Sequence, residues 1–222
     1  MRATIVSISG FSSEVGKTTT LCKLLRLLPG WEAIKITRGH YRSCGKDPQA
    51  CCVSPLLGQQ PLVLSSREET CVQGKDTGRY WQAGAGRVHW VIGTDEQIEA
   101  GIKTALGRVE QEGVFIEGGS FLKHVKADYS VMVASPAIKD IKSSAVGVLS
   151  KMDALIINRA EPGPEAVAEI KERLLKRGAR LSDMHVYFDH EIQLVAREIN
   201  RIHRARFSPP RLSGFTGSRR VL

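Results

Sequence analysis

Hydrophobic and polar positions along the chain alternate between short apolar runs and longer segments of helical period. Thr4–Ser9 reads TIVSIS, a continuous β-rich run that is typical of a strand buried on both faces. Thr18–Leu28 follows it with leucines on one face, which predicts a helix that ends before Pro29-Gly30. The chain therefore begins with a buried strand that leads almost directly into an amphipathic helix.

The same alternation continues to residue 202. Further strands are predicted at Ala33–Ile36, Val88–Ile92, Val114–Ile116, Tyr129–Ala134, Ala154–Ile157 and Met184–Phe188. Further helices are predicted at Asp76–Ala85, after Thr94, at Ser143–Ser150, after Pro164 and at Glu191–Ile202. Because alternating strands and helices give a mainly parallel sheet with helices on both faces, we expect a single three-layer α/β domain.

Two segments depart from this regularity. Residues 38–74 have no clean period and are rich in Gly, Pro, Ser and Cys, as is typical of a functional insert. Residues 203–222 form a basic C-terminal tail. We therefore expect one domain at 1–202 that carries an irregular insert at 38–74 and is followed by the tail.

The net charge of +9 is unevenly distributed along the chain. Six arginines follow Glu198 with no acidic residue among them, so residues 1–200 carry a charge of only +3. The tail is either a solvated end, a segment packed on the body, or a contact for an anionic partner. The three tryptophans are scattered and offer no stacking platform, so nucleic acid is not the expected partner.

Composition indicates a soluble protein. About 42% of the residues are hydrophobic, which is enough for a core, yet no run approaches the roughly 18 apolar residues of a membrane helix. The first residues run directly into the predicted strand and do not resemble a secretory signal. Five cysteines, an odd count, favour reduced thiols. A cytoplasmic protein that does not enter a membrane is therefore expected.

A glycine-rich loop, GFSSEVGKTT, joins the first strand to the first helix. Gly10 and Gly16 allow the tight bend that points backbone N–H groups at phosphate oxygens. Lys17 supplies a charge for the β- and γ-phosphates, and the Thr18 hydroxyl is suited to ligate Mg²⁺. The nucleotide-binding residues predicted here are Gly10, Ser12, Ser13, Glu14, Val15, Gly16, Lys17, Thr18 and Thr19. The loop therefore predicts a site for a purine nucleoside triphosphate with magnesium.

Five residues separate the two glycines of this loop, where four are usual. With this spacing, and with Glu14-Val15 before the second glycine, the loop resembles the G-x-x-x-x-x-G-K-T loop of dethiobiotin synthetases. More broadly it resembles the class of P-loop proteins that holds signal-recognition GTPases, partitioning ATPases and nickel-insertion GTPases. The resemblance implies a P-loop NTPase fold and a homodimer formed across the nucleotide sites.

A second acidic signal lies where strand Val114–Ile116 ends, in Glu117-Gly118-Gly119. A carboxylate at the carboxyl end of a strand beside a phosphate loop can hold Mg²⁺ through water or position a nucleophile. The FIEGG segment also resembles the V-E-G-x-G segment of dethiobiotin synthetases. The alternative is a solvated glutamate at a turn. We predict Thr18 and Glu117 as the magnesium residues and Lys17, Glu117 and Lys35 as the catalytic residues.

The base-reading residues are predicted where strand Ala154–Ile157 ends, at Asn158 and Arg159. The Asn158 amide can pair with a purine edge, or it can merely cap a turn. GTPases place an aspartate three residues after this asparagine, and this chain has the longer Glu161. The Asn-Arg pair resembles adenine-reading members of the class, which favours ATP over GTP.

Strand Ala33–Ile36 is expected beside the first strand. Lys35, Arg38 and His40 would then lie over the γ-phosphate and suit an anionic second substrate or the transferred phosphoryl group. We expect either an anionic small molecule or a partner protein near residues 35–76.

Residues 74–85, GKDTGRYWQAGA, resemble the G-K-D-T/S-x-R-x-x-x-A-G-A segment of the accessory proteins of molybdopterin-guanine dinucleotide biosynthesis. Those proteins also carry a Lys-x-x-x-His-like run after the second strand, and the resemblance covers about residues 1–120. It implies an accessory role in cofactor biosynthesis.

Cysteines concentrate in the irregular insert. Cys44, Cys51 and Cys52, with His40 and the later Cys71, have the donor types of a zinc site. They lack a C-x-x-C pair, so buried or loosely reactive thiols and redox chemistry remain as alternatives.

Two functions follow from these patterns. The first is an accessory NTPase in cofactor or metal-centre assembly, which the cysteine-bearing insert favours. The second is a small-molecule kinase or ligase-type enzyme that resembles dethiobiotin synthetase, which the basic residues near the γ-phosphate favour.

Overall fold

Eight strands and seven α-helices make up the described part of the chain in the computed structural model. The structure describes residues 3–39, 56–137, 140–158, 163–180, 182 and 184–207. The strands are β1 (Thr4–Gly10), β2 (Glu32–Arg38), β3 (Leu62–Leu64), β4 (Val88–Gly93), β5 (Gly113–Glu117), β6 (Tyr129–Ala134), β7 (Ala154–Ile157) and β8 (His185–Phe188). The helices are α1 (Lys17–Leu27), α2 (Arg67–Thr70), α3 (Asp76–Gln82), α4 (Ile98–Gly107), α5 (Ser143–Val146), α6 (Pro164–Lys176) and α7 (Ile192–Phe207). Short 3₁₀ turns lie at η3 (Ser120–Lys123), η4 (Leu149–Lys151) and η6 (Asp189–Glu191).

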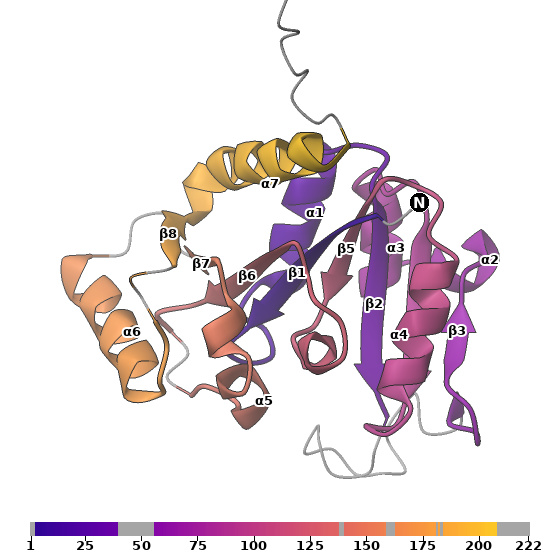
Figure 1. The fold of residues 1–222 in the computed structure, drawn as a ribbon, viewed down its shortest axis with the longest axis horizontal. Coiled ribbons are helices and arrows are strands. Elements are labelled where there is room, and N and C mark those ends of the chain that lie inside the picture. The colour runs from indigo at the N-terminus through magenta and orange to yellow at the C-terminus, as the bar shows by residue number, and fades with distance from the viewer. Residues whose placement is uncertain are drawn as a thin grey trace, which may run out of the picture.

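The strands form one sheet in the order β3-β4-β2-β5-β1-β6-β7-β8. Every neighbouring pair is parallel except β3 with β4, which is antiparallel. The carboxyl ends of the parallel strands therefore meet at one edge, at the bottom of Figure 1.

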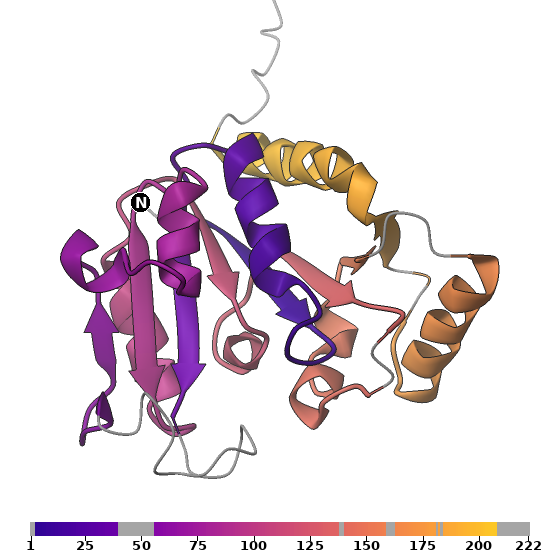
Figure 2. The same cartoon turned by 180° about the vertical axis from the view of Figure 1, so that it is seen from behind.

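Helices cover both faces of this sheet. Helices α1 and α3 lie in front in Figure 2, whereas α4 and η3 lie on the opposite face, in front in Figure 1. Both faces of the central strands are consequently buried, and β6 is buried at all six of its positions. This arrangement confirms the predicted three-layer α/β fold with a mainly parallel sheet.

The predicted position of β2 beside β1 is wrong, because β5 lies between them. β5 pairs with β1 on one side and with β2 on the other, so that Glu117 is in register with both Ile8 and Lys35. Order in the sheet depends on crossover connections, and the local pattern of the second strand does not specify it. The correction matters for the site, since it places Glu117 between the phosphate loop and Lys35.

Part of the segment expected to be irregular is regular. β3 and α2 both lie within residues 38–74. β3 has only three residues, too few for an alternating pattern, and it lies at the edge of the sheet beside β4.

Two helices also end at other residues than the sequence predicts. α7 continues past residue 202 to Phe207, because His203 packs between Trp31 and Phe207 with ring centroids 5.3 and 4.9 Å away. The helix expected over Ser143–Ser150 is shorter, since α5 ends at Val146 before Gly147 and a separate 3₁₀ turn follows. Residues 208–222 of the tail lie outside the described residues.

Among the described residues, no helix combines the length and the apolar character needed to cross a bilayer.

Candidate functional site

The glycine-rich loop bends between the end of β1 and the start of α1. Gly16 has a φ of 99° and is the residue before α1, in the left-handed region that glycine adopts without strain. A Cβ atom on Gly16 would lie 2.1 Å from Asn158 Nδ2, and one on Gly10 would lie 2.5 Å from Val15 Cγ2. The packing around both positions therefore favours glycine, since a side chain at either one would displace its neighbours.

Buried contacts fix this loop on the sheet. The side chains of Phe11 and Val15 are fully buried. The Phe11 N–H donates to the Val133 carbonyl at 3.1 Å, and the Asn158 Nδ2 group donates to the Val15 carbonyl at 2.8 Å. Asn158 thus stabilises the loop from β7, and the structure brings the predicted base-reading residue to within hydrogen-bond distance of the phosphate loop.

Lys17 is the first residue of α1, where the loop ends. Its Nζ donates to the Ser12 carbonyl at 2.6 Å, so the side chain folds back over the loop. Burial lowers the pKa of Lys17; the nearby Lys35 and Lys142 lower it further, and Glu117 opposes the shift. A partly desolvated ammonium group among other cations favours the arrival of an anion.

A cluster of polar groups surrounds the carboxylate of Glu117 at the end of β5. Glu117 is 3% exposed, and its Oε1 accepts from Lys35 Nζ at 2.5 Å. Its Oε2 accepts from the Thr18 hydroxyl at 2.8 Å and from the hydroxyl of the fully buried Tyr80. Glu117 is therefore not the solvated turn glutamate of the alternative interpretation, because three donors from three elements hold its charge.

Asp76 and Arg79, at the start of α3, extend the cluster. Lys35 Nζ also donates to Asp76 Oδ2 at 2.7 Å, and Arg79 donates to the Thr19 hydroxyl at 3.1 Å. Burial alone would raise the pKa of Asp76, but the Lys35 ammonium holds it below its usual value. Burial likewise opposes the charge of Lys35, and the two carboxylates outweigh it and raise the Lys35 pKa.

The donor types in this cluster fit magnesium. Thr18 and Glu117 supply a hydroxyl and a carboxylate oxygen within 2.8 Å of each other beside the phosphate loop. Mg²⁺ prefers such hard oxygen ligands and keeps several waters, so it needs few protein ligands. Among the described residues, no group of three or more His, Cys, Asp or Glu side chains could by itself hold a metal ion.

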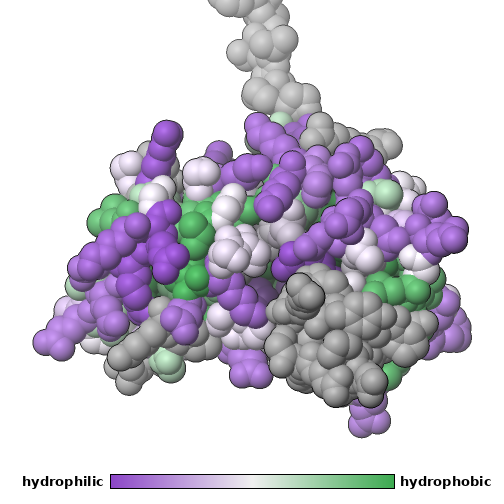
Figure 3. Space-filling view, turned by 90° about the horizontal axis from the view of Figure 1, so that it is seen from below, coloured by the Kyte–Doolittle hydropathy of each residue, from purple (hydrophilic) through white to green (hydrophobic). Residues whose placement is uncertain are grey.

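The phosphate loop and the cluster line one cavity of about 470 Å³. Its walls include Gly16, Thr18, Lys35, Asp76 and Glu117. It opens at the carboxyl edge of the sheet, where mostly hydrophilic side chains face the viewer in Figure 3. The position matches the general rule that ligands of open α/β sheets bind at the carboxyl ends of the strands.

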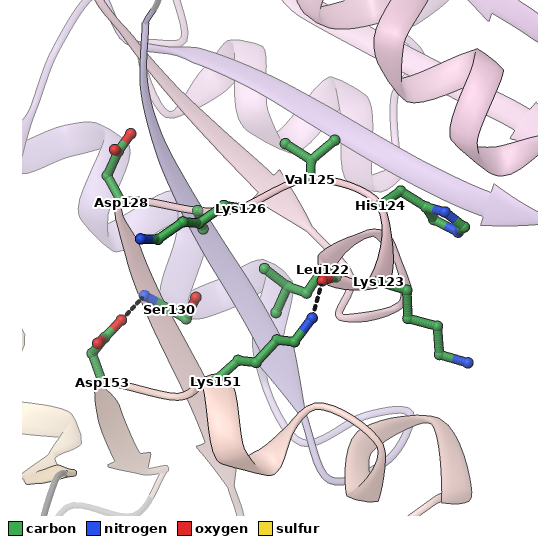
Figure 4. Close-up of a pocket in the computed structure, with 10 residues that line it drawn as sticks. Leu122, Lys123, His124, Val125, Lys126, Asp128, Ser130, Lys151 and Asp153 are labelled. Carbon is green, nitrogen blue, oxygen red and sulfur yellow. Dashed lines mark hydrogen bonds between the residues drawn. The ribbon is translucent and has the colours of Figure 1, made fainter.

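A larger cavity, of about 660 Å³, lies elsewhere, between η3, the start of β6 and the residues just before β7 (Figure 4). Its polar groups bond to the protein itself. Asp153 accepts from the Ser130 N–H at 2.7 Å, and Lys151 Nζ donates to the Leu122 carbonyl at 2.5 Å. Volume alone therefore does not identify the functional site.

The sequence matches no protein-family model and no curated protein. The fold does match solved structures. HypB from Helicobacter pylori, in complex with nickel, aligns with a TM-score of 0.52 at 15% identity over 93% of this chain and 88% of that chain. Because the phosphate loop joins β1 to α1 here and HypB is a P-loop NTPase, the alignment decides the fold. The chain has the P-loop NTPase fold.

Two further P-loop structures align less closely. LpxK from Aquifex aeolicus in complex with ATP has a TM-score of 0.44 at 16% identity, over 86% of this chain and 72% of that chain. The Zn(II)-bound YjiA GTPase from E. coli has a TM-score of 0.42 at 16% identity, over 84% of this chain and 57% of that chain.

The structure brings most of the predicted P-loop site together, and it adds residues that the sequence analysis left without a role. Asp76, Arg79 and Tyr80 belong to the motif quoted for the accessory proteins, so the resemblance itself was a usable signal for them. Lys142 donates to the Ser13 hydroxyl at 2.8 Å, and nothing in its sequence context pointed to the loop.

Several predicted residues cannot be placed. Arg159 and the predicted zinc ligands His40, Cys44, Cys51 and Cys52 lie outside the described residues. Of the other cysteines, Cys22 is buried on α1 and Cys71 is exposed.

Asp76, in the cluster around Glu117, predicts a pH dependence of the free energy of unfolding. Its lowered pKa means that its charge stabilises the fold above the unfolded-state pKa of about 3.9 and that this contribution is lost as the pH falls through the lower folded-state value. Asp76→Asn should therefore be less stable than the wild type at pH 7, and the difference should shrink on acidification below about pH 4. Denaturant unfolding from pH 7 to pH 3 measures both free energies.

Asp95→Asn is the matched control, because it removes a 55% exposed carboxylate paired with Arg38. It should cost less stability at pH 7 than Asp76→Asn. A difference between Asp76→Asn and the wild type that stays constant down to pH 3 would contradict the assignment.

Proposed function

We propose that the chain binds a purine nucleoside triphosphate with Mg²⁺ and cleaves it at the γ-phosphate. One observation carries the proposal: Lys17 and Thr18, at the start of α1, and Glu117, at the end of the distant strand β5, line one cavity. Lys35 joins them through its 2.5 Å contact with Glu117. The phosphate loop by itself would not require Glu117 or Lys35 at this position.

Each residue has a role that its position supports. The backbone of Gly10–Gly16 and the start of α1 would bind the phosphates, and Lys17 would stabilise the charge that develops on the transferred phosphoryl group. Thr18 and Glu117 would hold Mg²⁺, which supplies charge neutralisation between the phosphates when it is bound. Lys35 would hold the Glu117 carboxylate in position through their hydrogen bond.

The base is proposed to be a purine, and adenine is favoured over guanine. The position of Asn158 supports a base-reading role, since its amide lies against Val15 on the loop and beside Gly16 before α1. The preference for adenine rests on the Asn158-Arg159 pair, which resembles adenine-reading members of the class. Homodimer formation belongs to the same proposal, on the resemblance of the loop to its class. A cytoplasmic location is proposed on the odd number of cysteines, which favours reduced thiols.

Substitution of Lys17 tests the shared chemistry. Lys17→Ala should lower kcat/KM for Mg-triphosphate hydrolysis by about 100-fold or more, or roughly 2.7 kcal/mol, because a preorganised charge at the reacting phosphate is lost. Steady-state nucleoside diphosphate release measures the effect. Lys176→Ala removes a 71% exposed lysine of α6 and is the matched control, with unchanged kinetics. Unchanged binding and hydrolysis in Lys17→Ala would refute the proposal.

An accessory role in cofactor or metal-centre biosynthesis is the favoured biological use. It is supported by residues 74–85, the segment that resembles molybdopterin-guanine dinucleotide accessory proteins. That segment delivers Asp76, Arg79 and Tyr80 to the nucleotide cavity and its Glu117 cluster. The motif thus contributes side chains to the proposed active site, which a helix with an unrelated surface role would not do.

A small-molecule kinase or ligase-type enzyme is the second candidate. It is supported by basic side chains beside the loop, Arg38 and Lys142, which lie near Lys17 around a separate small cavity. In this candidate the phosphoryl group passes to an anionic small molecule and not to water.

Metal analysis separates the two candidates. Stoichiometric zinc or nickel in the purified protein, lost in Cys44→Ala and in Cys52→Ala, is expected for the accessory role. A metal-free protein whose triphosphate turnover rises sharply with a small acceptor is expected for the kinase. A Cys22→Ala variant is the control and should keep the metal, because Cys22 is buried on α1, outside the insert.

A further inference from the structure

A second cavity, of about 230 Å³, adjoins the phosphate loop on the side away from Thr18. It lies between the carboxyl ends of β1, β2 and β5 and the start of α5. Arg38 enters it from β2, Lys142 and Ser144 from the α5 region, and Ser120 from η3. With Ser12 and Lys17 from the phosphate loop, four separate segments of the chain therefore contribute polar side chains to this cavity.

The charge in this cavity has one sign. Lys17, Arg38 and Lys142 are its charged residues, and no carboxylate or histidine is among its described lining residues. Serine hydroxyls and the glycines after Glu117 complete the wall. Such a lining attracts an anion and offers it hydrogen-bond donors.

The two basic side chains that the nucleotide proposal does not use are held in place. Arg38 Nη1 lies 3.0 Å from Asp95 Oδ1, and Lys142 Nζ donates to the Ser13 hydroxyl at 2.8 Å. The backbone N–H of Lys142 also donates to the Phe11 carbonyl at 2.8 Å. Lys142 is thereby tied to the phosphate loop through both its backbone and its side chain.

The cavity adjoins the one assigned to the nucleotide. Both are lined by Ser13 and Lys17, so Lys17 stands at their junction. A group bound near Arg38 and Lys142 would consequently face the terminal phosphate on the far side from α1. This is the side from which an acceptor approaches in an in-line transfer.

We propose that this cavity binds the second substrate, a small molecule that presents a carboxylate or phosphate oxyanion, and that Arg38 and Lys142 determine this specificity. The inference rests on the proposed function, because it assumes a triphosphate in the loop, and within that function it favours the second candidate, transfer of the phosphoryl group to an anionic small molecule. The sequence analysis expected either an anionic small molecule or a partner protein near residues 35–76. The proposed site is smaller than that segment, and the proposal favours the small molecule.

An ionised acceptor also fits the chemistry of the lining. An acceptor oxyanion attacks the γ-phosphorus, the bond from that phosphorus to the β–γ bridging oxygen breaks, and the electron pair leaves with the nucleoside diphosphate. The acceptor oxygen carries no proton, so no base is required. A hydroxyl acceptor would need a base, and the described lining of this cavity supplies none.

Binding of simple anions to the full chain tests the inference. The protein is saturated with Mg²⁺ and a non-hydrolysable β,γ-imido triphosphate and is then titrated calorimetrically with inorganic phosphate, succinate or neutral succinamide. We expect one of the two anions to bind at a single site and succinamide not to bind. Arg38→Gln and Lys142→Gln should each weaken binding of that anion at least 10-fold, a larger factor than either weakens binding of the triphosphate analogue.

Lys176→Gln is the matched control for loss of one positive charge, and it should bind the anion as the wild type does. Phosphate binding without succinate binding identifies a phosphate-bearing substrate, and the reverse identifies a carboxylate. If neither anion binds while the analogue does, the inference fails and the proposed function stands. Anion binding that neither substitution weakens also overturns it. Failure of the analogue itself to bind refutes the proposed function.

Discussion

The site depends on the buried charge of Glu117. A carboxylate that is 3% exposed is costly unless it is paired and hydrogen-bonded, and here Lys35, Thr18 and Tyr80 supply those partners. Those three residues come from β2, α1 and α3. The requirement to satisfy one charge thus ties the phosphate loop, the central strands and the motif of residues 74–85 into a single unit.

The same constraint explains the electrostatics on both sides of the loop. Lys35 is held charged between Glu117 and Asp76, whereas Lys17, which has no carboxylate within its own hydrogen bonds, has its pKa lowered by burial. One cation therefore serves the structure and the other is left for a phosphate. The carboxylates gather on the side of Thr18, and the further cations Arg38 and Lys142 gather on the opposite side. The loop consequently separates a region suited to a metal cation from a region suited to an anion.

Local chemistry could be predicted from the sequence where the signal and the function occupy neighbouring residues. Three predictions are of this kind. They are the phosphate loop, Glu117 at the end of a strand, and Lys35 in the second predicted strand. The parallel α/β fold was also predictable, because strands buried on both faces read as continuous apolar runs.

What could not be predicted depends on contacts between distant segments. The place of β5 between β1 and β2 follows from crossover connections, and it alone brings Glu117 into register with Lys35. Lys142 contacts Ser13, which is 129 residues away in the sequence, and no sequence pattern around Lys142 indicates this contact. The extension of α7 to Phe207 depends on the packing of His203 against Trp31. The many arginines after residue 200 indicated a basic tail there and gave no sign of this contact.

The most direct test of the account is the magnesium dependence of triphosphate binding in the wild type and in Glu117→Gln. If Glu117 and Thr18 hold the metal, Mg²⁺ should tighten binding of the β,γ-imido triphosphate by about 10-fold or more, roughly 1.4 kcal/mol, in the wild type. Most of that gain should be lost in the variant, whose fold is verified by its unfolding transition. Equal affinities with and without Mg²⁺ in the wild type, or a full magnesium effect in Glu117→Gln, would contradict it.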